Sequence, residues 1–211
     1  MRRNNSQISR GVLSELSRLR KLASTVESNQ QLLGIEGLAA KLYFQNFAGM
    51  LKPSVSFDFN KRTRRPPTDP INALLSFCYT LLVKDVVKAL IIVGLDPYRG
   101  LFHQMRSTRP ALALDLAEEF RPLIADSVTL SVVNNRIISN DDFVYAGPAC
   151  SLKDSPKKNL IAAYERRMES LVIHPTFGYK VSYRRVIEIQ ARLLARTIEG
   201  ELNNYIGFTT R

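Results

Sequence analysis

The stretch PINALLSFCYTLLVKDVVKALIIVG, residues 70–94, decides the fold class of this 211-residue chain. Asp69 is a favourable N-cap residue, Pro70 suits the first turn of a helix, and Gly94 suits its end. The stretch therefore predicts one long helix. Its longest apolar run, residues 71–83, is too short to cross a bilayer and is followed at once by two charged residues, so we expect no membrane span.

Apolar residues at three- and four-residue intervals predict further helices on both sides of this one. These helices span residues 12–27, 31–50, about 110–122, 155–171 and 183–199. Pro122 should kink or end the third of them. Residues 127–138 fit a strand or a helix equally well, and Gly147-Pro148 within residues 143–152 predicts a small β-hairpin. The predicted fold class is therefore mainly α, with one small β-hairpin.

The charge of the chain narrows the class of partner. A net charge of +11 attracts polyanions. Nucleic acid is favoured over a membrane surface because no helix combines Lys and Arg with Trp. The two cysteines have no metal-ligand spacing, and the N-terminus lacks the apolar core of a signal peptide, so we expect a cytoplasmic protein. Residues 1–30 are interpreted as a basic amphipathic helix and linker, and residues 31–211 as one helical domain.

Glu36 lies among apolar helical neighbours. The positions i−4, i−3, i+4 and i+7 from it hold Leu32, Leu33, Ala40 and Tyr43, so the spacing directs its carboxylate to the apolar face. A buried carboxylate is costly unless it is paired or bound to a metal. Two interpretations stay open, a buried ion pair with a distant arginine and a metal ligand.

One of the two histidines, His103, lies in GLDPYRGLFHQM, residues 94–105. We expect a turn followed by a short helix that carries this histidine. A lone histidine on an apolar helix is usually a hydrogen-bonded core residue, and the alternative is a metal ligand.

Three acids follow on the next predicted helix. Asp115 stands three residues before Glu118 and four before Glu119, so all three share a helix face. The spacing does not tell which of them faces inward, and solvation of all three is the alternative. With the glutamate and histidine above, they make a hard donor set that suits Mg²⁺ or Mn²⁺. A divalent-metal site in a basic protein indicates phosphodiester chemistry on nucleic acid.

The segment Lys61-Arg62-Thr63-Arg64-Arg65 places four positive charges in five residues. A solvated loop is the simplest interpretation. Two prolines follow and stiffen the chain, which favours phosphate contact along a defined path. We expect Arg62, Arg64 and Arg65 to contact DNA phosphates, with Arg109 as a further candidate.

Several segments in this order resemble the CRISPR-associated adaptation integrases, the Cas-one endonucleases. The resemblance runs through GIEGLAAKLYFQNF, RRPPTDPINALLSFCYTLL, GLDPYRGLFHQ, RPALALDLAEEFRPLIAD and YRRVIEIQARLLARTIEGE. It covers roughly residues 30–200. It implies the all-helical catalytic lobe of that family.

The resemblance also implies a single divalent metal ion, Mg²⁺ or Mn²⁺, bound by a glutamate, a histidine and a second acid. Carried over by motif, these ligands are Glu36, His103 and Glu118, so Glu118 is preferred over Glu119. Asp115 matches an additional acid one turn earlier, and Asn72 matches a polar position that lines the site.

Family members carry a small β-rich domain before the helical lobe, which helps to build a homodimer. This sequence begins about thirty residues before the Glu36 segment. We therefore expect the β domain to be absent and the homodimer to be lost with it. The partners that the resemblance implies are DNA, as protospacer fragment and CRISPR repeat, and the adaptation protein Cas-two.

The function that the sequence predicts is a metal-dependent DNA endonuclease and integrase of CRISPR spacer acquisition. Two alternatives remain. One is a generic basic metallonuclease acting in repair or transposition, and the other is a non-catalytic lobe that only binds DNA or partner proteins.

Overall fold

The computed structural model describes residues 8–102 and 109–210. Within them the chain is mainly helical, as predicted. The α-helices are α1 (Arg10–Ala23), α2 (Asn29–Gln45), α3 (Pro70–Ile92), α4 (Ala111–Ala117), α5 (Asp126–Asn134), α6 (Asp154–Glu169) and α7 (Tyr183–Ile198). Short helical turns are η2 (Phe47–Met50), η3 (Arg121–Ala125) and η4 (Asn140–Asp142), and the strands are β1 (Phe143–Ala146), β2 (Ala149–Leu152), β3 (Leu171–Ile173) and β4 (Lys180–Ser182).

These elements form two compact units. Unit 1 consists of residues 1–74 and 130–153, and unit 2 consists of residues 75–129 and 154–211. The division falls inside α3, after Leu74, and inside α5, after Thr129. A domain boundary at residue 30, expected from the sequence, stays a prediction.

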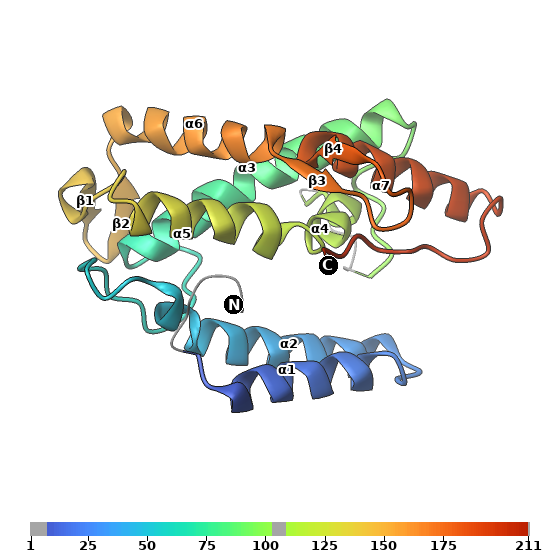
Figure 1. Cartoon of the computed structure of the whole chain (residues 1–211), viewed down its shortest axis with the longest axis horizontal. Coiled ribbons are helices and arrows are strands. Elements are labelled where there is room, and N and C mark those ends of the chain that lie inside the picture. The colour runs from blue at the N-terminus through green and yellow to red at the C-terminus, as the bar shows by residue number, and fades with distance from the viewer. Residues whose placement is uncertain (1–7, 103–108, 211) are drawn as a thin grey trace. The chain divides into compact units, whose positions relative to one another are not determined.

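In unit 1, α1 and α2 form a helical hairpin (Figure 1). Ser9 caps α1 by accepting a hydrogen bond from the Val12 N–H, and Ser28 caps α2 in the same way from Gln31. At the end of α2 and in η2, an aromatic cluster supplies the buried core. Phe47 is fully buried, and its ring centroid lies 5.1 Å from that of Phe59.

The β1–β2 hairpin completes unit 1 and confirms the turn predicted at Gly147-Pro148. Its strands pair antiparallel, with Phe143 opposite Leu152 and Ala146 opposite Ala149. The Cys150 N–H donates to the Pro67 carbonyl at 2.8 Å. That bond fastens the proline end of the basic loop to the hairpin.

The core of unit 2 follows one face of α3. Leu75, Cys78, Leu82, Val86 and Leu90 recur at three- or four-residue steps, and all are fully buried. Apolar residues of α4, α6 and α7 complete the core, including Leu116, Leu160 and Val186. Burial raises the pKa of the Cys78 thiol to about 12.

Polar contacts tie the helices of unit 2 together around Asp85 on α3. The Tyr164 hydroxyl of α6 donates to the Asp85 carboxylate at 2.8 Å. Arg184, in the first turn of α7, lies 2.7 Å from Glu169, 2.5 Å from Glu165 and 3.8 Å from Asp85. The charged Asp85, which follows the apolar run of α3, is thus accommodated by partners on α6 and α7.

The structure resolves one ambiguity and departs from the sequence prediction elsewhere. Residues 126–134 are helical, as α5, and not a strand. The predicted helix over residues 31–50 breaks into α2 and η2. A second hairpin, β3–β4, was not predicted, because three-residue strands are too short to show an alternating pattern. No helix in the described part of the chain is long and apolar enough to span a bilayer.

The helix expected over about residues 110–122 is shorter than predicted. α4 stops at Ala117, five residues before Pro122, so Glu118 and Glu119 follow the helix, and residues 121–125 form one π-helical turn, η3, before α5 begins. A π turn interrupts the regular i→i−4 hydrogen bonding of an α-helix. Arg167 of α6 donates from Nε to the Leu123 carbonyl in this turn at 2.7 Å.

Candidate functional site

The residues predicted as metal ligands fall in different parts of the structure. Glu36 belongs to α2 in unit 1, Glu118 follows α4 in unit 2, and His103 lies outside the described residues. The expected burial of Glu36 is wrong. Its side chain is partly exposed, and no residue of α2 is buried. Two leucines of this helix, Leu33 and Leu38, are 46% and 58% exposed.

Asp115 fastens the segment that leads to His103. Its Oδ2 atom accepts hydrogen bonds from the backbone N–H groups of Leu101, at 2.8 Å, and Phe102, at 3.0 Å. At the other end of the segment, the Pro97 carbonyl accepts from the Leu112 N–H at 2.9 Å, in the first turn of α4. The turn at residues 97–102 is thus held against α4 at two points, and the side chain of Asp115 supplies one of them.

Glu118 forms an ion pair with Arg121 at the start of η3. The guanidinium of Arg121 also lies over the Tyr79 ring, 5.0 Å from its centroid, and the Tyr79 hydroxyl donates to buried Asp126 at 2.6 Å. The Glu118 side chain keeps 33% of its surface exposed. Glu118 therefore has a cationic neighbour, and its side chain stays partly exposed although Oε1 itself is buried.

Glu119 has a different role from its neighbour. Its Oε1 accepts from the Tyr205 hydroxyl at 2.5 Å, and its Oε2 accepts from the Phe208 N–H at 2.7 Å and from Gln190 Nε2 at 3.2 Å. Burial raises the pKa of Glu119, although these hydrogen bonds oppose the shift. The carboxylate anchors the C-terminal segment, residues 200–210, and its oxygens are occupied by that segment and α7.

A buried histidine belongs to the same cluster and was not predicted as part of any site. His174 is 1% exposed, and its ring centroid lies 5.6 Å from that of Phe208. Burial lowers the pKa of His174, and the nearby Gln190 side chain opposes this. Sequence spacing gave no signal for this cluster, because Glu119, His174, Gln190 and Phe208 are far apart in the chain.

Asn72 organises the basic loop of unit 1. It is fully buried in the first turn of α3. Its Oδ1 accepts from Arg62 Nη1 at 2.7 Å and from the Thr63 N–H at 3.0 Å, and its Nδ2 donates to the Lys61 carbonyl at 2.8 Å and to Asp69 at 2.5 Å. Asp69 also accepts from the Asn72 N–H at 2.9 Å, which confirms the predicted N-cap. A role for Asn72 in lining a metal site stays a prediction.

The arginines of the loop divide into two kinds. Arg62 is partly buried and is bound to Asn72, so its guanidinium shapes the loop. Arg64 and Arg65 are exposed, as is Arg109 just before α4. The exposed residues suit phosphate contact better, because they can bind an anion without breaking the loop.

The carboxylates in this part of the structure show whether a divalent metal ion could be bound. Glu118 offers a carboxylate on a partly exposed side chain, and carboxylates are the ligand type that Mg²⁺ and Mn²⁺ prefer. Glu119 does not, since three hydrogen bonds engage both of its oxygens. Among residues 8–102 and 109–210, no three His, Cys, Asp or Glu side chains gather as a metal site would require. The chemistry of the donors fits the ion, and the predicted ligand set extends beyond the described residues.

Comparison with known proteins settles the family. The model of the family described as CRISPR associated protein Cas1 matches residues 1–166, more than half of the chain. The chain belongs to the Cas1 family.

Curated Cas1 relatives match nearly the whole chain. It is 52% identical over 205 residues to a CRISPR-associated exonuclease Cas4/endonuclease Cas1 fusion from Geobacter sulfurreducens, covering 95% of this chain and 37% of that protein. It is 43% identical over 189 residues to a CRISPR-associated endonuclease Cas1 from Thermus thermophilus, covering 90% and 56%. The chain thus spans between about a third and somewhat over half of the length of these two relatives.

Solved structures give the same family. A CAS1 protein from Thermotoga maritima superposes with a TM-score of 0.78 at 29% identity, over 93% of this chain and 60% of that one. A casposase bound to integration product superposes with a TM-score of 0.79 at 26% identity, over 92% and 57%. A chain of a Cas6-RT-Cas1–Cas2 complex gives a TM-score of 0.82 at 26% identity, over 96% of this chain and 22% of that one.

The first prediction concerns Asp115. Asp115→Ala removes the acceptor of the Leu101 and Phe102 amides, so we expect hydrogen exchange in residues 97–102 to accelerate by about tenfold or more, from the loss of two hydrogen bonds to a charged group. Asp115→Asn keeps one side-chain oxygen, and both amides use a single oxygen in the native chain, so exchange should stay near the native rate. Mass spectrometry of peptides covering the turn measures this. Equal acceleration in both variants would contradict the positioning role.

The second prediction concerns Glu119. Glu119→Ala leaves the Phe208 N–H and the Tyr205 hydroxyl without their acceptor, so we expect the free energy of unfolding to fall by about 2–3 kcal/mol. Glu119→Gln should cost much less, because the amide oxygen can accept from Phe208 and Gln190 while the amide nitrogen faces the Tyr205 oxygen. Thermal and denaturant unfolding of both variants measures the difference.

The pH dependence of Glu119 has a definite sign. Between its ordinary pKa of 4.5 and the raised pKa of the folded state, the folded chain binds a proton that the unfolded chain does not. The native protein should therefore gain stability relative to Glu119→Gln as pH falls from neutral to about pH 5. A stability difference that does not change with pH would show that this carboxylate pays no burial penalty.

Proposed function

We propose that this chain is the catalytic lobe of a metal-dependent DNA endonuclease and integrase of CRISPR spacer acquisition. The observation that carries the proposal is the match of nearly the whole chain to proteins named as Cas1 endonucleases, at 52% and 43% identity. The likeness to a casposase bound to integration product supports strand transfer as well as cleavage.

The residues proposed to hold the ion are Glu36, His103 and Glu118, with Mg²⁺ or Mn²⁺ as the metal. Glu118 is preferred over Glu119 because hydrogen bonds occupy both oxygens of Glu119, whereas Glu118 has an ion pair with Arg121. Asp115 is assigned to binding the amides of Leu101 and Phe102. When bound, the cation supplies charge neutralisation at the scissile phosphate and at the leaving oxygen.

The proposed reaction is a direct transesterification. The 3′-hydroxyl of a captured DNA fragment attacks a phosphodiester at the boundary of a CRISPR repeat, and a 3′-oxygen of the target strand leaves. With water in place of the 3′-hydroxyl, the same chemistry cuts DNA. On the protein side, Asp115 would keep the segment before His103 in place, and Arg121 would hold the Glu118 carboxylate in one orientation.

DNA and Cas2 are the proposed partners. The net charge of +11 favours DNA capture, and the solved complex that contains both Cas1 and Cas2 supports the protein partner. For phosphate contact we propose the exposed Arg64 and Arg65, with Arg109 nearer to α4, and we assign Arg62 to holding the shape of the loop.

The casposase likeness favours one competing function, strand transfer in transposition. A target choice experiment separates the two. A spacer-acquisition enzyme supplied with Cas2 joins a DNA fragment to plasmids at a repeat boundary, whereas a transposition enzyme joins it to sites that do not depend on the repeat. A lobe that only binds DNA would neither cut a plasmid nor join the DNA fragment to one, whether or not the plasmid carries the repeat.

The third prediction tests the proposed ligands. Glu36→Ala, His103→Ala and Glu118→Ala should each reduce Mn²⁺-dependent nicking of plasmid DNA by about a hundredfold or more, while most duplex binding is retained. Glu119→Gln is the matched control, because it changes the adjacent carboxylate and should preserve the fold. Inactivation by Glu119→Gln together with a silent Glu118→Ala would show that the ligand is the wrong residue of the pair.

The fourth prediction tests the basic loop. Each phosphate that a cation neutralises contributes about 0.9 to the log–log dependence of duplex affinity on salt. The double variant Arg64→Gln, Arg65→Gln should therefore lower the slope by about 1.8 if both contact phosphates. The control is Lys158→Gln with Arg166→Gln, two exposed cations of α6. Equal slopes for the two double variants would show that the loop is only solvated.

A further inference from the structure

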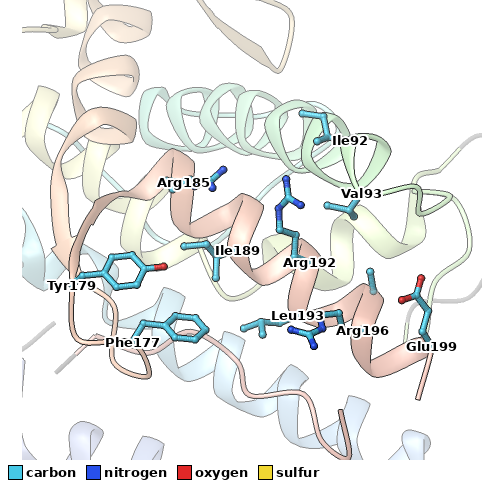
Figure 2. A pocket seen from close by; sticks show the side chains of 11 residues that line it. Ile92, Val93, Phe177, Tyr179, Arg185, Ile189, Arg192, Leu193, Arg196 and Glu199 are labelled. Carbon is cyan, nitrogen blue, oxygen red and sulfur yellow. The ribbon is translucent and has the colours of Figure 1, made fainter. Parts of the chain in front are cut away.

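A groove of about 640 Å³ lies on unit 2, and none of the residues assigned above lines it. Its walls come from the C-terminal end of α3, from the β3–β4 turn and from one face of α7. The floor is aliphatic and includes Ile189 and Leu193. Figure 2 shows two aromatic rings at one end of this groove and Glu199 at the other, with arginine side chains between them.

The aromatic end is a preformed platform. Phe177 and Tyr179 stand two residues apart in the β3–β4 turn, with ring centroids 5.9 Å apart and ring planes inclined by only 22°. They are 46% and 48% exposed. The turn is fixed by hydrogen bonds from the His174 N–H to the Tyr179 carbonyl, at 3.0 Å, and from the Gly178 N–H to the His174 carbonyl, at 2.8 Å. The turn thus holds two stacked rings in place with about half of their surface exposed to solvent. Exposed apolar surface of this kind is unfavourable unless a ligand covers it.

The cationic wall is a row on a single helix. Arg185, Arg192 and Arg196 of α7 follow at steps of seven and four residues, which keeps them on one face, with rises of about 10 Å and 6 Å along the axis. Arg185 pairs with Glu188, and Arg196 pairs with Glu201 at 2.6 Å. Arg192, in the middle, is exposed and has no acidic partner among the described residues.

We propose that this groove binds a single strand of nucleic acid, with bases stacked on Phe177 and Tyr179 and phosphates along the arginine row. Aromatic faces next to a basic groove are the two parts that sequence-tolerant single-strand binding requires. A duplex does not satisfy the site in the same way, because its bases are already stacked on one another. The inference rests on the proposed function in one respect, since that function supplies DNA as the natural strand.

An acidic peptide segment is the other occupant that such charges attract. The observations favour a nucleic-acid strand for two reasons. The cations form a row about 16 Å long and not a single pocket, which matches a repeating anion. The rings of Phe177 and Tyr179 are inclined by only 22° and can continue a stack of bases, whereas an aliphatic side chain would be held by the floor alone.

The fifth prediction tests the groove by fluorescence anisotropy with the full chain and a labelled oligothymidylate of about 12 nucleotides. EDTA is present, so that no metal contributes to binding. The double variant Phe177→Leu, Tyr179→Leu keeps apolar bulk and removes the ring faces, and should weaken binding by about tenfold. Arg192→Gln should lower the salt slope for the single strand by about 0.7. The matched control is Arg166→Gln, which removes from α6 of the same unit an exposed cation that has no acidic partner within residues 8–102 and 109–210.

Three results would overturn the inference. In the first, the aromatic and Arg192 variants bind the oligonucleotide as Arg166→Gln does. In the second, the aromatic variant loses affinity for blunt duplex as strongly as for the single strand, which would mark a general phosphate surface. In the third, poly-glutamate displaces the oligonucleotide from native and aromatic variants alike at equal concentration. Circular dichroism melts exclude variants that fail to fold.

The assay separates this inference from the proposed function. If the native chain does not nick DNA with Mn²⁺ but the binding pattern holds in EDTA, the nuclease proposal fails and the groove stands. If nicking is present but the groove variants bind like the control, only the groove inference fails.

Discussion

Burial of the Glu119 carboxylate is the constraint on which the arrangement of unit 2 depends. An ionised side chain in this position needs every available donor, and it obtains them from α7 and from the C-terminal segment. Because Glu118 is the preceding residue, fixing Glu119 inward directs Glu118 away from that cluster. The two adjacent acids therefore have different partners: Glu119 binds α7 and the C-terminal segment, and Glu118 pairs with Arg121.

Elsewhere the loops are built by side chains that satisfy backbone groups. Asp115 binds two consecutive amides, and Asn72 joins a carbonyl, an amide, an arginine and an aspartate in one carboxamide. Such bonds define loop shape without any regular secondary structure. Asp115 and Asn72 can therefore serve a proposed site by fixing the shape of its loops, without touching the substrate.

Periodicity predicted the long helices because their cores depend on steps of three and four residues. The buried row from Leu75 to Leu90 and the cap at Asp69 both follow the sequence pattern. Periodicity did not predict the β3–β4 hairpin or the break after α2, since each involves only a few residues. Sequence also could not separate Arg62 from Arg64 and Arg65, because the difference is a hydrogen bond to Asn72 that is formed only in the folded loop.

The site was predicted unevenly for a related reason. Helical spacing placed three acids on one face but could not tell which of them meets the C-terminal segment. The acid that does so is Glu119, and its partners Gln190 and Phe208 lie more than seventy residues away in the chain. The expected burial of Glu36 failed because no residue of α2 is buried, so the apolar neighbours of Glu36 do not enclose its carboxylate. Long-range partners, not local pattern, decide the environment of each carboxylate.

The burial of both sulfur atoms has a practical consequence for spectroscopy. Cys78 and Cys150 are buried, and burial raises the pKa of each thiol, so neither offers an accessible thiolate near neutral pH. Maleimide reagents attack thiolates, and these two will react slowly while the chain is folded. A cysteine introduced at an exposed position of α1 or α6 can therefore carry a fluorophore or spin label at one defined position, with the native cysteines left in place.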